Sequence, residues 1–377
     1  MSLEEIRKEI DCIDNELTKL LQKRMDCSLK VAEIKKAEGL PVYHPKREQE
    51  IIDKVSALGG RYGEYIGQIY RFLMACSREV QHEELNYNNN PLFDKNVQTE
   101  LNVKGRIACY GEVGAFTHLA LIGAFGEENV SPVFCESFED VFKAVDNELV
   151  KFGIIPVENS SAGSVSAVYD LILKYKSFIV SSVTMPVRQN LLGIKGAALS
   201  DITTVYSHPQ ALSQCNNFIK EHSLTPKEYL STATAAKMVA NQSDKTVAAI
   251  GSTYCQRVNG LELLAENIQS FKGNKTRFIV ISKTPIITKD REKISLVFSL
   301  PHTPGSLQKI LTRFSLHGLN LTKLESRAGK NGDFETCFYL DFLGDAENTK
   351  TKSLLLDLKE DLPDFAFLGN YKEINLV

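Results

Sequence analysis

The sequence lacks a long hydrophobic run, an excess of basic residues and any paired cysteine motif. No apolar stretch approaches the ~18 residues that a helix needs to cross a bilayer. The 44 Lys and Arg against 47 Asp and Glu leave a net charge of −3, so no general positive field exists to hold a nucleic-acid backbone. The 8 cysteines include no Cys-x-x-Cys pair, and we interpret them as reduced, small hydrophobic side chains. We expect no membrane segment and no nucleic-acid partner.

The start of the chain and its composition indicate an ordinary cytoplasmic protein. The first residues, Met-Ser-Leu-Glu-Glu, are acidic where a secretory leader is basic and then apolar. Hydrophobic residues make up 43% and charged residues 24%, as in soluble globular proteins. A length of 377 residues exceeds the ~250 to 300 at which a single hydrophobic core stops growing. The length therefore predicts two or three domains.

Changes in periodicity divide the chain into three segments. Residues 1–84 have helical periodicity and predict an all-α domain. Residues 85–103 have the Asn- and Pro-containing composition of a solvated linker. Short β-branched runs alternate with helical patterns over residues 104–284, which is typical of α/β layers. Residues 293–377 follow the order strand, helix, two strands, helix, strand, which is typical of an α+β ferredoxin-like fold.

One long helix is predicted at the start of the first segment. Apolar residues recur at spacings of four and three from Ile6 to Ile34. Ser2 and Glu5 form a capping box and Gly39 supplies a stop, so the helix spans roughly 35 residues. A helix of that length cannot bury its apolar stripe inside a monomer of about 80 residues. We therefore expect an interlocked homodimer, or a bundle with a partner.

Arg24 stands in this apolar stripe, where the pattern otherwise places aliphatic residues. A buried cation needs an anion, and Lys35 falls on the same helix face at about 100° per residue. Together the two cations can hold one dianion. Arg7 lies roughly 100° away around the helix and far along it, so we expect it to serve a partner's pocket. A coiled coil with one polar position that sets its register is an open alternative on the pattern alone.

Polar residues on two shorter predicted helices complete a pattern that resembles the all-helical chorismate mutase family over residues 3–82. Glu48 heads the second helix with Arg47 beside it, and Ser77 and Gln81 form an i, i+4 pair on the third. The family's pocket maps onto Arg7, Arg24, Lys35, Arg47, Glu48, Ser77 and Gln81. The family's reaction, chorismate to prephenate, needs no acid, base or nucleophile, only a dicarboxylate held in its reactive conformation and charge relief at the breaking ether bond.

The resemblance implies a role for each of these mutase residues. Arg24 and Arg7 of the partner chain would hold carboxylates. Lys35 and Gln81 would face the ether oxygen, and Glu48 would take the ring hydroxyl. The two remaining positions are implied substrate-binding residues, namely Arg47 and Ser77.

Helix starts in the middle segment are rich in glycine and small hydroxyl residues, which present backbone N–H groups to anions. None matches a G-x-G-x-x-G dinucleotide loop or a phosphate-binding GK[ST] loop, and each alone is explained as a helix cap. Together they resemble prephenate dehydratase over residues 105–283. The motifs are Val-Glu-Asn-Ser-Ser at 157–161, Tyr-Ser-His-Pro-Gln at 206–210, Ser-Thr-Ala at 231–233 and Thr-Arg-Phe at 276–278.

This second resemblance implies two α/β lobes joined by a hinge, like a periplasmic binding protein, with the site in the cleft between them. Prephenate loses carbon dioxide and its ring hydroxyl there to give phenylpyruvate, which requires a proton donor and anion contacts. Thr276 is the implied donor. The implied substrate-binding residues are Glu158, Asn159, Ser160, Ser161, Ser207, Gln214, Ser231, Thr232, Arg277 and Phe278.

Alternatives stay open for four residues of this segment. Glu158 is a second candidate for the proton source, and Arg277 is equally well explained as a buried structural arginine. His208 precedes a proline and is interpreted as a hydrogen bonder that fixes a loop rather than as an acid. His118, at the start of a helical stretch, is also interpreted as structural.

The C-terminal segment resembles an ACT domain, a regulatory fold that commonly binds amino acids where two copies pair. The family's two phenylalanine-contacting motifs match Gly305-Ser306-Leu307, which opens the first helix, and Glu325-Ser326-Arg327, which closes the second strand. The alternative is a plain ferredoxin-like scaffold in which Gly305 is only a turn residue.

Three positions depart from the family patterns. His44 stands where the mutases usually have an acidic residue, which is tolerable if that position contributes mainly a backbone N–H. Gln308 and Ala328 replace the usual apolar residue and proline beside the phenylalanine motifs.

The order mutase, dehydratase, ACT resembles the family of bifunctional chorismate mutase/prephenate dehydratases. This implies an enzyme of phenylalanine biosynthesis with phenylalanine as its inhibitor, acting as a homodimer or higher homo-oligomer without cofactor or metal. A fusion of the mutase with a prephenate dehydrogenase would need a nicotinamide-binding glycine loop, which the sequence lacks. A non-catalytic amino-acid sensor with a two-lobed binding domain and an ACT module would leave the mutase residues and Thr276 unexplained.

Overall fold

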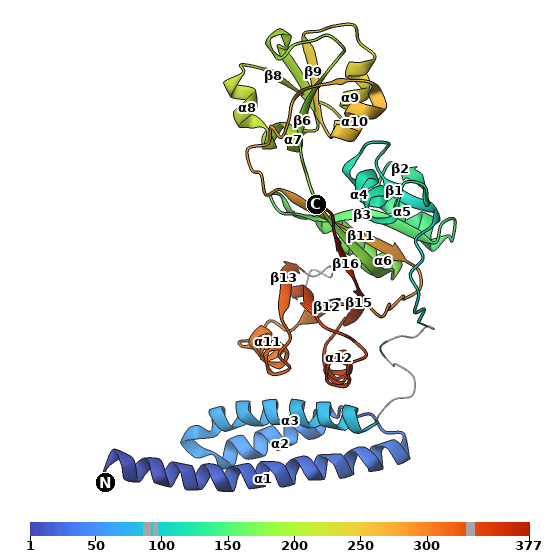
Figure 1. Cartoon of the computed structure of the whole chain (residues 1–377). Helices are drawn as coiled ribbons and strands as arrows, with labels where there is room; N and C mark the ends of the chain where they lie inside the picture. The colour runs from blue at the N-terminus through green and yellow to red at the C-terminus, as the bar shows by residue number, and fades with distance from the viewer. Residues whose placement is uncertain (86–91, 93–96, 329–335) are drawn as a thin grey trace. The chain divides into compact units, whose positions relative to one another are not determined.

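The computed structural model describes residues 1–85, 92, 97–328 and 336–377 (Figure 1). The chain divides into two compact units. The first joins Met1–Asp94 to Lys293–Phe367, and the second joins Lys95–Glu292 to Leu368–Val377. Within the described ranges, no helix combines the length and the apolar character that a bilayer span requires.

Three helices form the N-terminal part of the first unit (Figure 1). They are α1 (Leu3–Glu38), α2 (Pro45–Leu58) and α3 (Gly63–Leu85), and α3 packs against the other two. At the start of α1, Ser2 Oγ accepts from the Glu5 N–H and the Glu5 carboxylate accepts from the Ser2 N–H. The helix ends at Gly39, whose φ of +65° is a left-handed conformation that glycine adopts without a Cβ clash. The long helix predicted from the sequence is confirmed, with 36 residues.

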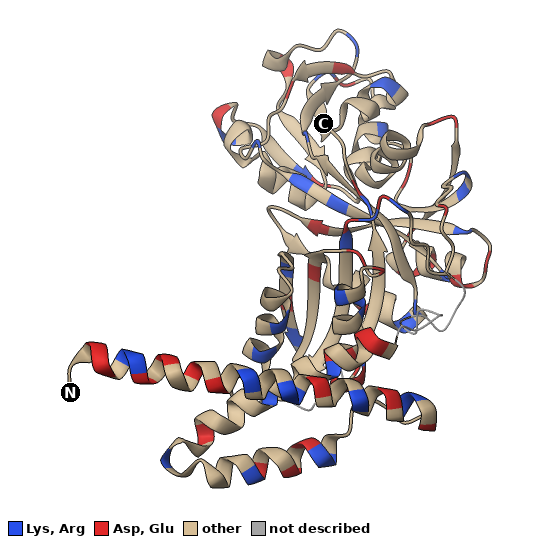
Figure 2. Ribbon diagram, turned by 60° about the horizontal axis from the view of Figure 1, so that its bottom comes forward, with Lys and Arg blue, Asp and Glu red and all other residues tan. Residues whose placement is uncertain are grey.

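The N-terminal half of α1 is exposed in this chain. Acidic and basic residues are interspersed along it (Figure 2). Its large apolar side chains are also open to solvent, namely Leu3, Ile6, Ile10, Ile13, Leu17 and Leu20. The buried residues of α1, Ser28 and Ala32, both lie in its C-terminal half. In many proteins an exposed apolar stripe of this kind is covered by a second helix. The homodimer stays a prediction, and this stripe is the feature that supports it.

The C-terminal part of the first unit has the βαββαβ order that was predicted. Its elements are β12 (Lys293–Leu300), α11 (Ser306–Leu316), β13 (Leu321–Ala328), β14 (Thr336–Leu343), α12 (Thr349–Asp361) and the start of β15 (Ala366–Tyr371), a strand whose residues from Leu368 onward belong to the second unit. The strands form one sheet in the order β13-β14-β12-β15, and β14 is antiparallel to both β12 and β13. This is a ferredoxin-like arrangement.

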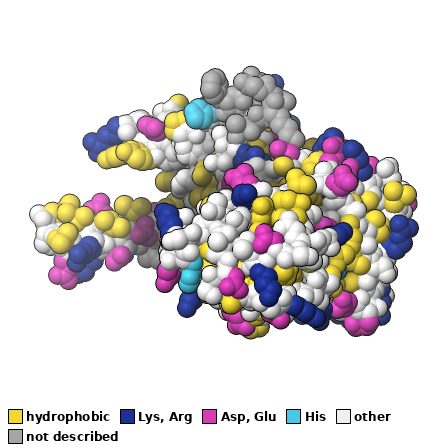
Figure 3. Space-filling model, turned by 90° about the horizontal axis from the view of Figure 1, so that it is seen from above, with side chains coloured by type: hydrophobic (Ala, Val, Ile, Leu, Met, Phe, Trp, Pro, Cys, Tyr) yellow, Lys and Arg dark blue, Asp and Glu magenta, His cyan; other side chains and the backbone are white. Residues whose placement is uncertain are grey.

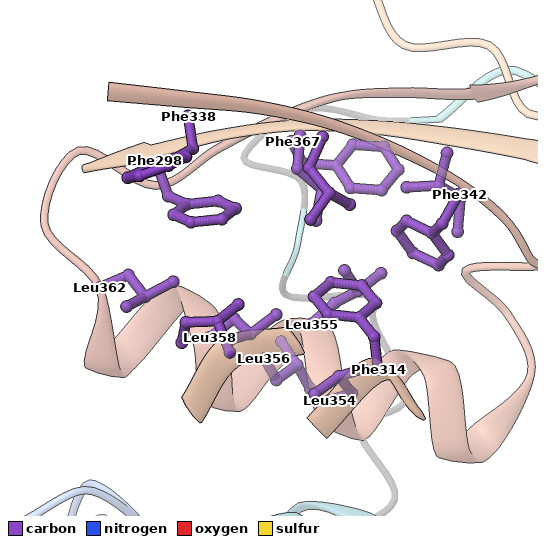
Figure 4. Packing of buried hydrophobic residues seen from close by; sticks show 14 of the residues in the cluster. Phe298, Phe314, Phe338, Phe342, Leu354, Leu355, Leu356, Leu358, Leu362 and Phe367 are labelled. Atoms are coloured by element: carbon purple, nitrogen blue, oxygen red, sulfur yellow. The ribbon is translucent and has the colours of Figure 1, made fainter. Parts of the chain in front are cut away.

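An apolar core lies between this sheet and its two helices (Figure 4). Phe314 of α11 packs edge-on against Phe342 of β14, and Phe298 of β12 stacks with Phe338 of β14. The α12 side chains in this core include Leu354, Leu355, Leu356 and Leu358. Each such side chain, fully buried, contributes roughly 1.5–3 kcal/mol. The core therefore fixes the orientation of α11 and α12, and with it the polar residues on their outer faces.

The second unit contains a first lobe built on a mixed sheet in the order β16-β5-β11-β3-β1-β2, with β4 paired to β3 (Figure 1). The strands are β1 (Gly105–Tyr110), β2 (Val130–Cys135), β3 (Phe152–Asn159), β4 (Gly163–Ser164), β5 (Phe178–Pro186), β11 (Lys275–Ser282) and β16 (Glu373–Asn375). The helices are α4 (Phe116–Phe125), α5 (Phe138–Asp146) and α6 (Ser166–Tyr175). Buried β-branched and aromatic residues such as Ile107, Ile154 and Phe278 form its core.

The second lobe of this unit has a five-stranded sheet in the order β10-β6-β9-β7-β8. Its strands are β6 (Asn190–Gly193), β7 (Thr204–Ser207), β8 (Thr225–Glu228), β9 (Val247–Gly251) and β10 (Glu262–Ala265). Its helices are α7 (Pro209–Gln214), α8 (Asn216–Glu221), α9 (Thr232–Ala240) and α10 (Thr253–Asn259). The two-lobed α/β architecture expected from the sequence is therefore present.

Two chain segments connect the lobes, residues 187–189 on the way out and residues 266–274 on the way back. They hydrogen-bond to each other, because the Val187 N–H donates to the Asn274 carbonyl and the Ile268 N–H donates to the Gln189 carbonyl, both at 2.9 Å. Paired crossings of this kind form a hinge between the lobes.

On the face that Figure 3 shows, Lys and Arg side chains lie among acidic and hydrophobic ones rather than in one continuous patch. The small net charge of the chain is thus distributed on that face without a strong local field of one sign.

The last ten residues, Leu368–Val377, belong with the two-lobed unit, which the sequence did not indicate. Strand β16 pairs with β5 in parallel, and Leu376 lies against Gly123 of α4. At Gly369 the chain approaches β5 so closely that an added Cβ would meet the Ile179 carbonyl oxygen at 2.0 Å. Only glycine fits this contact.

We predict that Gly369→Ala destabilises the two-lobed unit, because the methyl group must displace the backbone of β5. Overpacking of this kind costs about 1–3 kcal/mol. The measurement is the unfolding midpoint in urea, followed by near-UV circular dichroism. Gly251→Ala is the matched control, since the atom nearest to its added Cβ would be Leu192 Cδ1 at 3.5 Å, an ordinary van der Waals contact. Equal midpoints for the two variants would contradict the close approach at Gly369.

Candidate active sites

Arg24 joins α1 to α3 in the helical part of the first unit. Its guanidinium donates to Ser77 Oγ at 2.6 Å, and Ser77 Oγ donates to the Leu73 carbonyl at 2.9 Å. One turn further along α3, Gln81 Nε2 donates to the Ser77 carbonyl at 3.1 Å. The Gln81 Oε1 atom is buried and has no hydrogen-bond partner among the described residues. The structure thus brings together three residues that the sequence singled out, Arg24, Ser77 and Gln81.

Lys35 and Glu48 lie within electrostatic reach of each other near the loop that joins α1 to α2. Lys35 Nζ donates to the Val42 carbonyl at 2.5 Å. Burial lowers the pKa of Lys35, while the carboxylates of Glu360 and Glu48 act in the opposite direction. Glu48 Oε2 accepts from Arg78 at 2.6 Å. Arg78 is a residue that the sequence did not single out.

Arg7 and Arg47 do not join these contacts within one chain. Arg7 lies on the exposed half of α1. Arg47 is exposed and pairs at 3.4 Å with Glu50, one turn along α2. At the departing position, His44 Nδ1 accepts from the Arg47 N–H at 3.3 Å and caps α2. A histidine there is therefore compatible with the start of the helix.

Thr276 and Asn159 meet in the first lobe of the second unit, where β11 pairs with β3. Asn159 Nδ2 donates to Thr276 Oγ1 at 2.8 Å and to Asn274 Oδ1 at 3.0 Å. Asn159 Oδ1 accepts from the N–H groups of Ser161 and Ala162, both at 3.0 Å, and from the Ser161 hydroxyl. One amide side chain therefore orients both the loop after β3 and the threonine hydroxyl.

The hydrogen bond from Asn159 determines whether the Thr276 hydroxyl is a donor or an acceptor toward other groups. Thr276 Oγ1 is the acceptor in this contact, so its own O–H remains available to donate. No acceptor for that O–H is present among the described residues. Thr276 is 8% exposed, which keeps the hydroxyl oriented and largely shielded from solvent.

Two polar contacts connect the lobes around this position. Gln214 Nε2 of α7 donates to Ser161 Oγ at 3.2 Å. Ser231, which caps α9, donates from its hydroxyl to Glu112 in the loop after β1 at 2.7 Å. Thr232 is the first residue of α9. The sequence-predicted residues Ser161, Gln214 and Ser231 therefore lie where the two lobes face each other.

Arg277 and Glu158 sit opposite each other on β11 and β3, with a nitrogen–oxygen distance of 3.8 Å. Ser160 Oγ accepts from the Lys275 N–H at 2.9 Å, so its hydroxyl fixes the same pair of strands. These contacts stabilise the strand ends that carry Thr276.

Two of the predicted substrate-binding side chains have structural contacts instead. Phe278 is 1% exposed and packs in the apolar core of the first lobe. Ser207 is fully buried and donates to the Ile250 carbonyl at 2.7 Å, which ties β7 to β9. These contacts give both side chains a structural role, and a role in substrate binding stays a prediction for them.

Both histidines interpreted as structural make structural contacts. His208 Nδ1 accepts from the Gln210 N–H at 3.2 Å and caps α7. His118 Nδ1 accepts from the Gly114 N–H at 3.2 Å, and its ring lies edge-on to those of Phe134 and Tyr254. Burial lowers the pKa of His118.

Sequence reasoning missed Asn274, Gln189 and Glu112 in this unit. Asn274 Oδ1 accepts from Asn159, Ser160 and Ser161, and its Nδ2 is buried without a partner among the described residues. Asn274 lies two residues before Thr276, and this position next to a predicted site residue could have indicated it from the sequence. Gln189 lies in a hinge segment and Glu112 in a loop, where no periodicity marks a functional side chain.

In the ferredoxin-like part, the two predicted motifs lie at the same end of the sheet. Arg327 of β13 is opposite Cys337 of β14, which in turn is opposite Ser299 near the end of β12. Gly305, with a φ of +78°, precedes α11 directly after β12. A cavity of about 690 Å³ beside α11 is lined by residues that include Gly305, Ser306, Leu307 and Gln308.

Glu325 is ion-paired with Lys323 at 3.3 Å, and Ser326 is exposed on the edge strand β13. Ala328 ends this strand. In the described part of the chain, no group of three or more His, Cys, Asp or Glu residues is placed to hold a metal ion.

Comparison with known proteins decides the family. Residues 6–82 match the model of chorismate mutase type II, and residues 107–286 match the model of prephenate dehydratase. A bifunctional chorismate mutase/prephenate dehydratase from Aquifex aeolicus is 32% identical over 98% of this chain and 97% of its own length. The chain belongs to this bifunctional family. It is a chorismate mutase and a prephenate dehydratase, and the alternative of a non-catalytic sensor is not favoured.

Two solved structures are similar to 71% of this chain. A quorum-quenching acylase, GqqA, is 30% identical with a TM-score of 0.64 over 97% of its length. A prephenate dehydratase from Arthrobacter aurescens in complex with L-Phe is 28% identical with a TM-score of 0.65 over 90% of its length.

Proposed function

We propose that the residues gathered in the helical part convert chorismate to prephenate and that Thr276 and its neighbours convert prephenate to phenylpyruvate. We further propose that the βαββαβ part is an ACT domain through which phenylalanine inhibits the enzyme. The observation that carries the dehydratase assignment is the Asn159–Thr276 hydrogen bond, which leaves the threonine O–H free to donate.

In the mutase site, Arg24 binds a substrate carboxylate with the guanidinium N–H groups that Ser77 does not use. Lys35 has N–H groups beyond the one bonded to Val42, and with Gln81 it faces the ether oxygen on which negative charge develops. Glu48 binds the ring hydroxyl. The site acts by holding the dicarboxylate in its reactive conformation and by stabilising the developing charge.

Arg7 belongs to the same site through a homodimer. The exposed apolar stripe of α1 supports this proposal, because pairing of two copies would bury the stripe and bring Arg7 of one copy to the pocket of the other. Arg47 lies at the start of α2, near Glu48, and adds to the positive field for the substrate.

We predict that Arg24→Ala abolishes mutase turnover and that Arg7→Ala does the same, while both variants convert supplied prephenate. Mixing the two inactive variants would then restore about a quarter of the wild-type mutase activity, since half of the dimers are hybrids with one intact pocket. The control is Arg61→Ala, because Arg61 lies in the same helical part and has neither the role proposed for Arg24 nor that proposed for Arg7. The absence of recovery, despite subunit exchange seen by mass spectrometry, would contradict a role for Arg7 across the dimer.

In the dehydratase site, the bond to the departing carboxylate breaks and its electron pair enters the ring, while the ring hydroxyl takes up a proton and leaves as water. Thr276 donates its hydrogen bond to that oxygen, and a threonine acts here by hydrogen bonding or by relaying a proton because its hydroxyl is a weak acid. Ser160, Ser161, Gln214, Ser231 and Thr232 supply neutral donors for the carboxylates around the cleft. Arg277, paired with Glu158, keeps the local charge balanced.

Thr276→Val keeps the shape of the side chain and removes the hydroxyl. If the hydroxyl acts in the transition state, kcat for prephenate falls by about 10², or about 2.7 kcal/mol, with a smaller change in KM. Steady-state formation of phenylpyruvate measures both parameters. Thr225→Val, at an exposed position on β8, is the control. A rise in KM alone would reassign Thr276 to substrate binding.

The ACT proposal is supported by the ferredoxin-like sheet and by the position of the two motifs at one end of it. The backbone N–H groups of Gly305 and Leu307 bind the carboxylate of phenylalanine, and Ser306, whose N–H donates to the Thr303 carbonyl, lies between them. Glu325, Ser326 and Arg327 lie on the edge strand, where a second copy would pair. Inhibition follows if phenylalanine has higher affinity for the state with an inactive dehydratase cleft.

Glu325→Gln tests this site without removing the C-terminal strand β16, which a truncation before residue 293 would take away. Loss of the charge facing the phenylalanine ammonium raises the half-inhibitory concentration about 10-fold, or about 1.4 kcal/mol. The measurement is dehydratase activity against phenylalanine concentration, with Glu347→Gln in the same part of the chain as control. An unchanged inhibition curve would place phenylalanine elsewhere.

A further inference from the structure

A buried group of charged residues joins α3 of the mutase part to α11 and α12 of the ferredoxin-like part. Arg78 is 4% exposed and Asp357 is fully buried, and the Arg78 guanidinium donates to both carboxylate oxygens of Asp357. From the opposite side, Asp357 also accepts from Arg313, which is 4% exposed. All of these residues belong to the first compact unit.

Arg78 also reaches into the mutase site. Its third contact is Glu48 Oε2 at 2.6 Å, and the ring of Tyr43 lies 4.7 Å from its guanidinium carbon. A guanidinium presents a rigid planar fork of donors, so Asp357 on one edge fixes the direction of the N–H that faces Glu48. Among the residues that the structure describes, none donates a hydrogen bond to Glu48 Oε1, so that oxygen is available for a substrate hydroxyl.

Arg78 balances the negative charge of the carboxylates that surround it. Asp361 Oδ2 lies 3.5 Å from the same guanidinium, so Arg78 is shared by the carboxylates of Glu48, Asp357 and Asp361. Burial acts to lower the pKa of Arg78, but these carboxylates outweigh it and raise the pKa above its usual value. Without Arg78, the carboxylate of Glu48 would face other carboxylates and turn away.

The helix α12 supports the mutase part at a second point. Glu360 Oε2 accepts from the Tyr43 N–H at 3.0 Å, in the loop whose Val42 carbonyl accepts from Lys35. The loop between α1 and α2 is therefore held by Lys35 from the mutase side and by Glu360 from α12.

We propose that Arg78 is a positioning residue for the mutase reaction: it orients Glu48, and Asp357 of the C-terminal part fixes Arg78. The inference rests on the proposed role of Glu48 in binding the ring hydroxyl. It makes the ferredoxin-like part a structural component of the mutase site, in addition to its proposed regulatory role.

The experiment compares the purified full-length variants Glu48→Gln, Arg78→Met and Arg78→Lys, and each Arg78 variant combined with Glu48→Gln, by steady-state mutase kinetics. Arg78→Met is expected to lower kcat at least about 10-fold with KM changed less than about 3-fold. Arg78→Lys regains part of the loss because it keeps the charge. In the Glu48→Gln background, Arg78→Met adds less than about 3-fold, since residues that act through one another have non-additive effects.

Arg313→Met is the matched control, because Arg313 is equally buried and contacts Asp357 but not Glu48. It is expected to lower the unfolding temperature about as much as Arg78→Met does, because both changes leave Asp357 with one cation, and to keep the kcat of the folded enzyme within about 3-fold of the wild type. Far-UV circular dichroism and thermal unfolding report the folding of every variant. If Arg78→Met loses its helical signal, the kinetics of Arg78→Lys test the proposal in its place. A kcat of Arg78→Lys below that of the wild type, with an effect that is non-additive with Glu48→Gln, supports the proposal. An unchanged kcat of Arg78→Lys overturns it.

The possible failures are distinguishable. An unchanged mutase activity in Glu48→Gln would overturn the role of Glu48, and the inference with it. A loss in Glu48→Gln, combined with an additive loss in the double variant or an equal loss in Arg313→Met, would overturn the inference alone and leave the role of Glu48 in place.

Discussion

Asp357 lies fully buried between the guanidinium groups of Arg78 and Arg313, and the arrangement of the first unit depends on this contact. A buried carboxylate is costly unless cations pair with it, and removing one partner of such a pair typically costs about 3–5 kcal/mol. Apolar residues of similar volume often stabilise a protein as well as a buried ion pair does. The charges add geometric specificity, because Arg78 of α3 and Arg313 of α11 both pair with Asp357 of α12 and so tie the three helices together.

The two-lobed unit depends instead on strand β11, which returns from the second lobe and inserts between β3 and β5. This return places residues that are 117 positions apart, Asn159 and Thr276, at hydrogen-bond distance. The same strand follows the hinge segment that carries Asn274. A change in the lobe angle would therefore act on the loop and strand ends that orient the Thr276 hydroxyl, which is a route by which the proposed phenylalanine inhibition could reach the dehydratase site.

Periodicity and local motifs predicted the structural features that are determined by residues close together in the sequence. The 36-residue α1, its capping box, the two-lobed α/β unit and the βαββαβ order all follow from such patterns. The sequence did not indicate Arg78, because its partner Asp357 lies 279 positions further along the chain and no local pattern marks a cation paired at such a sequence separation. Phe278 was placed at the site by the motif Thr-Arg-Phe at 276–278, and a motif does not say on which side of its strand each side chain lies; Phe278 packs in the apolar core. The strand β16 was missed because three residues show no period.

The two proposed sites would bind related dicarboxylates by different physical means. In the helical site, Arg24 and Lys35 are cations with N–H groups beyond those bonded to Ser77 and Val42, which suits a reaction whose only demand is charge stabilisation and conformation. Around Thr276 the described contacts are between amides and hydroxyls, and the nearby Arg277 is balanced by Glu158. A neutral network keeps the threonine hydroxyl directed by Asn159 alone, whereas an unpaired cation beside it would compete for the leaving oxygen. Since a weak acid can assist only if its hydroxyl already points at the leaving group, orientation by Asn159 is the requirement that the rest of this site serves.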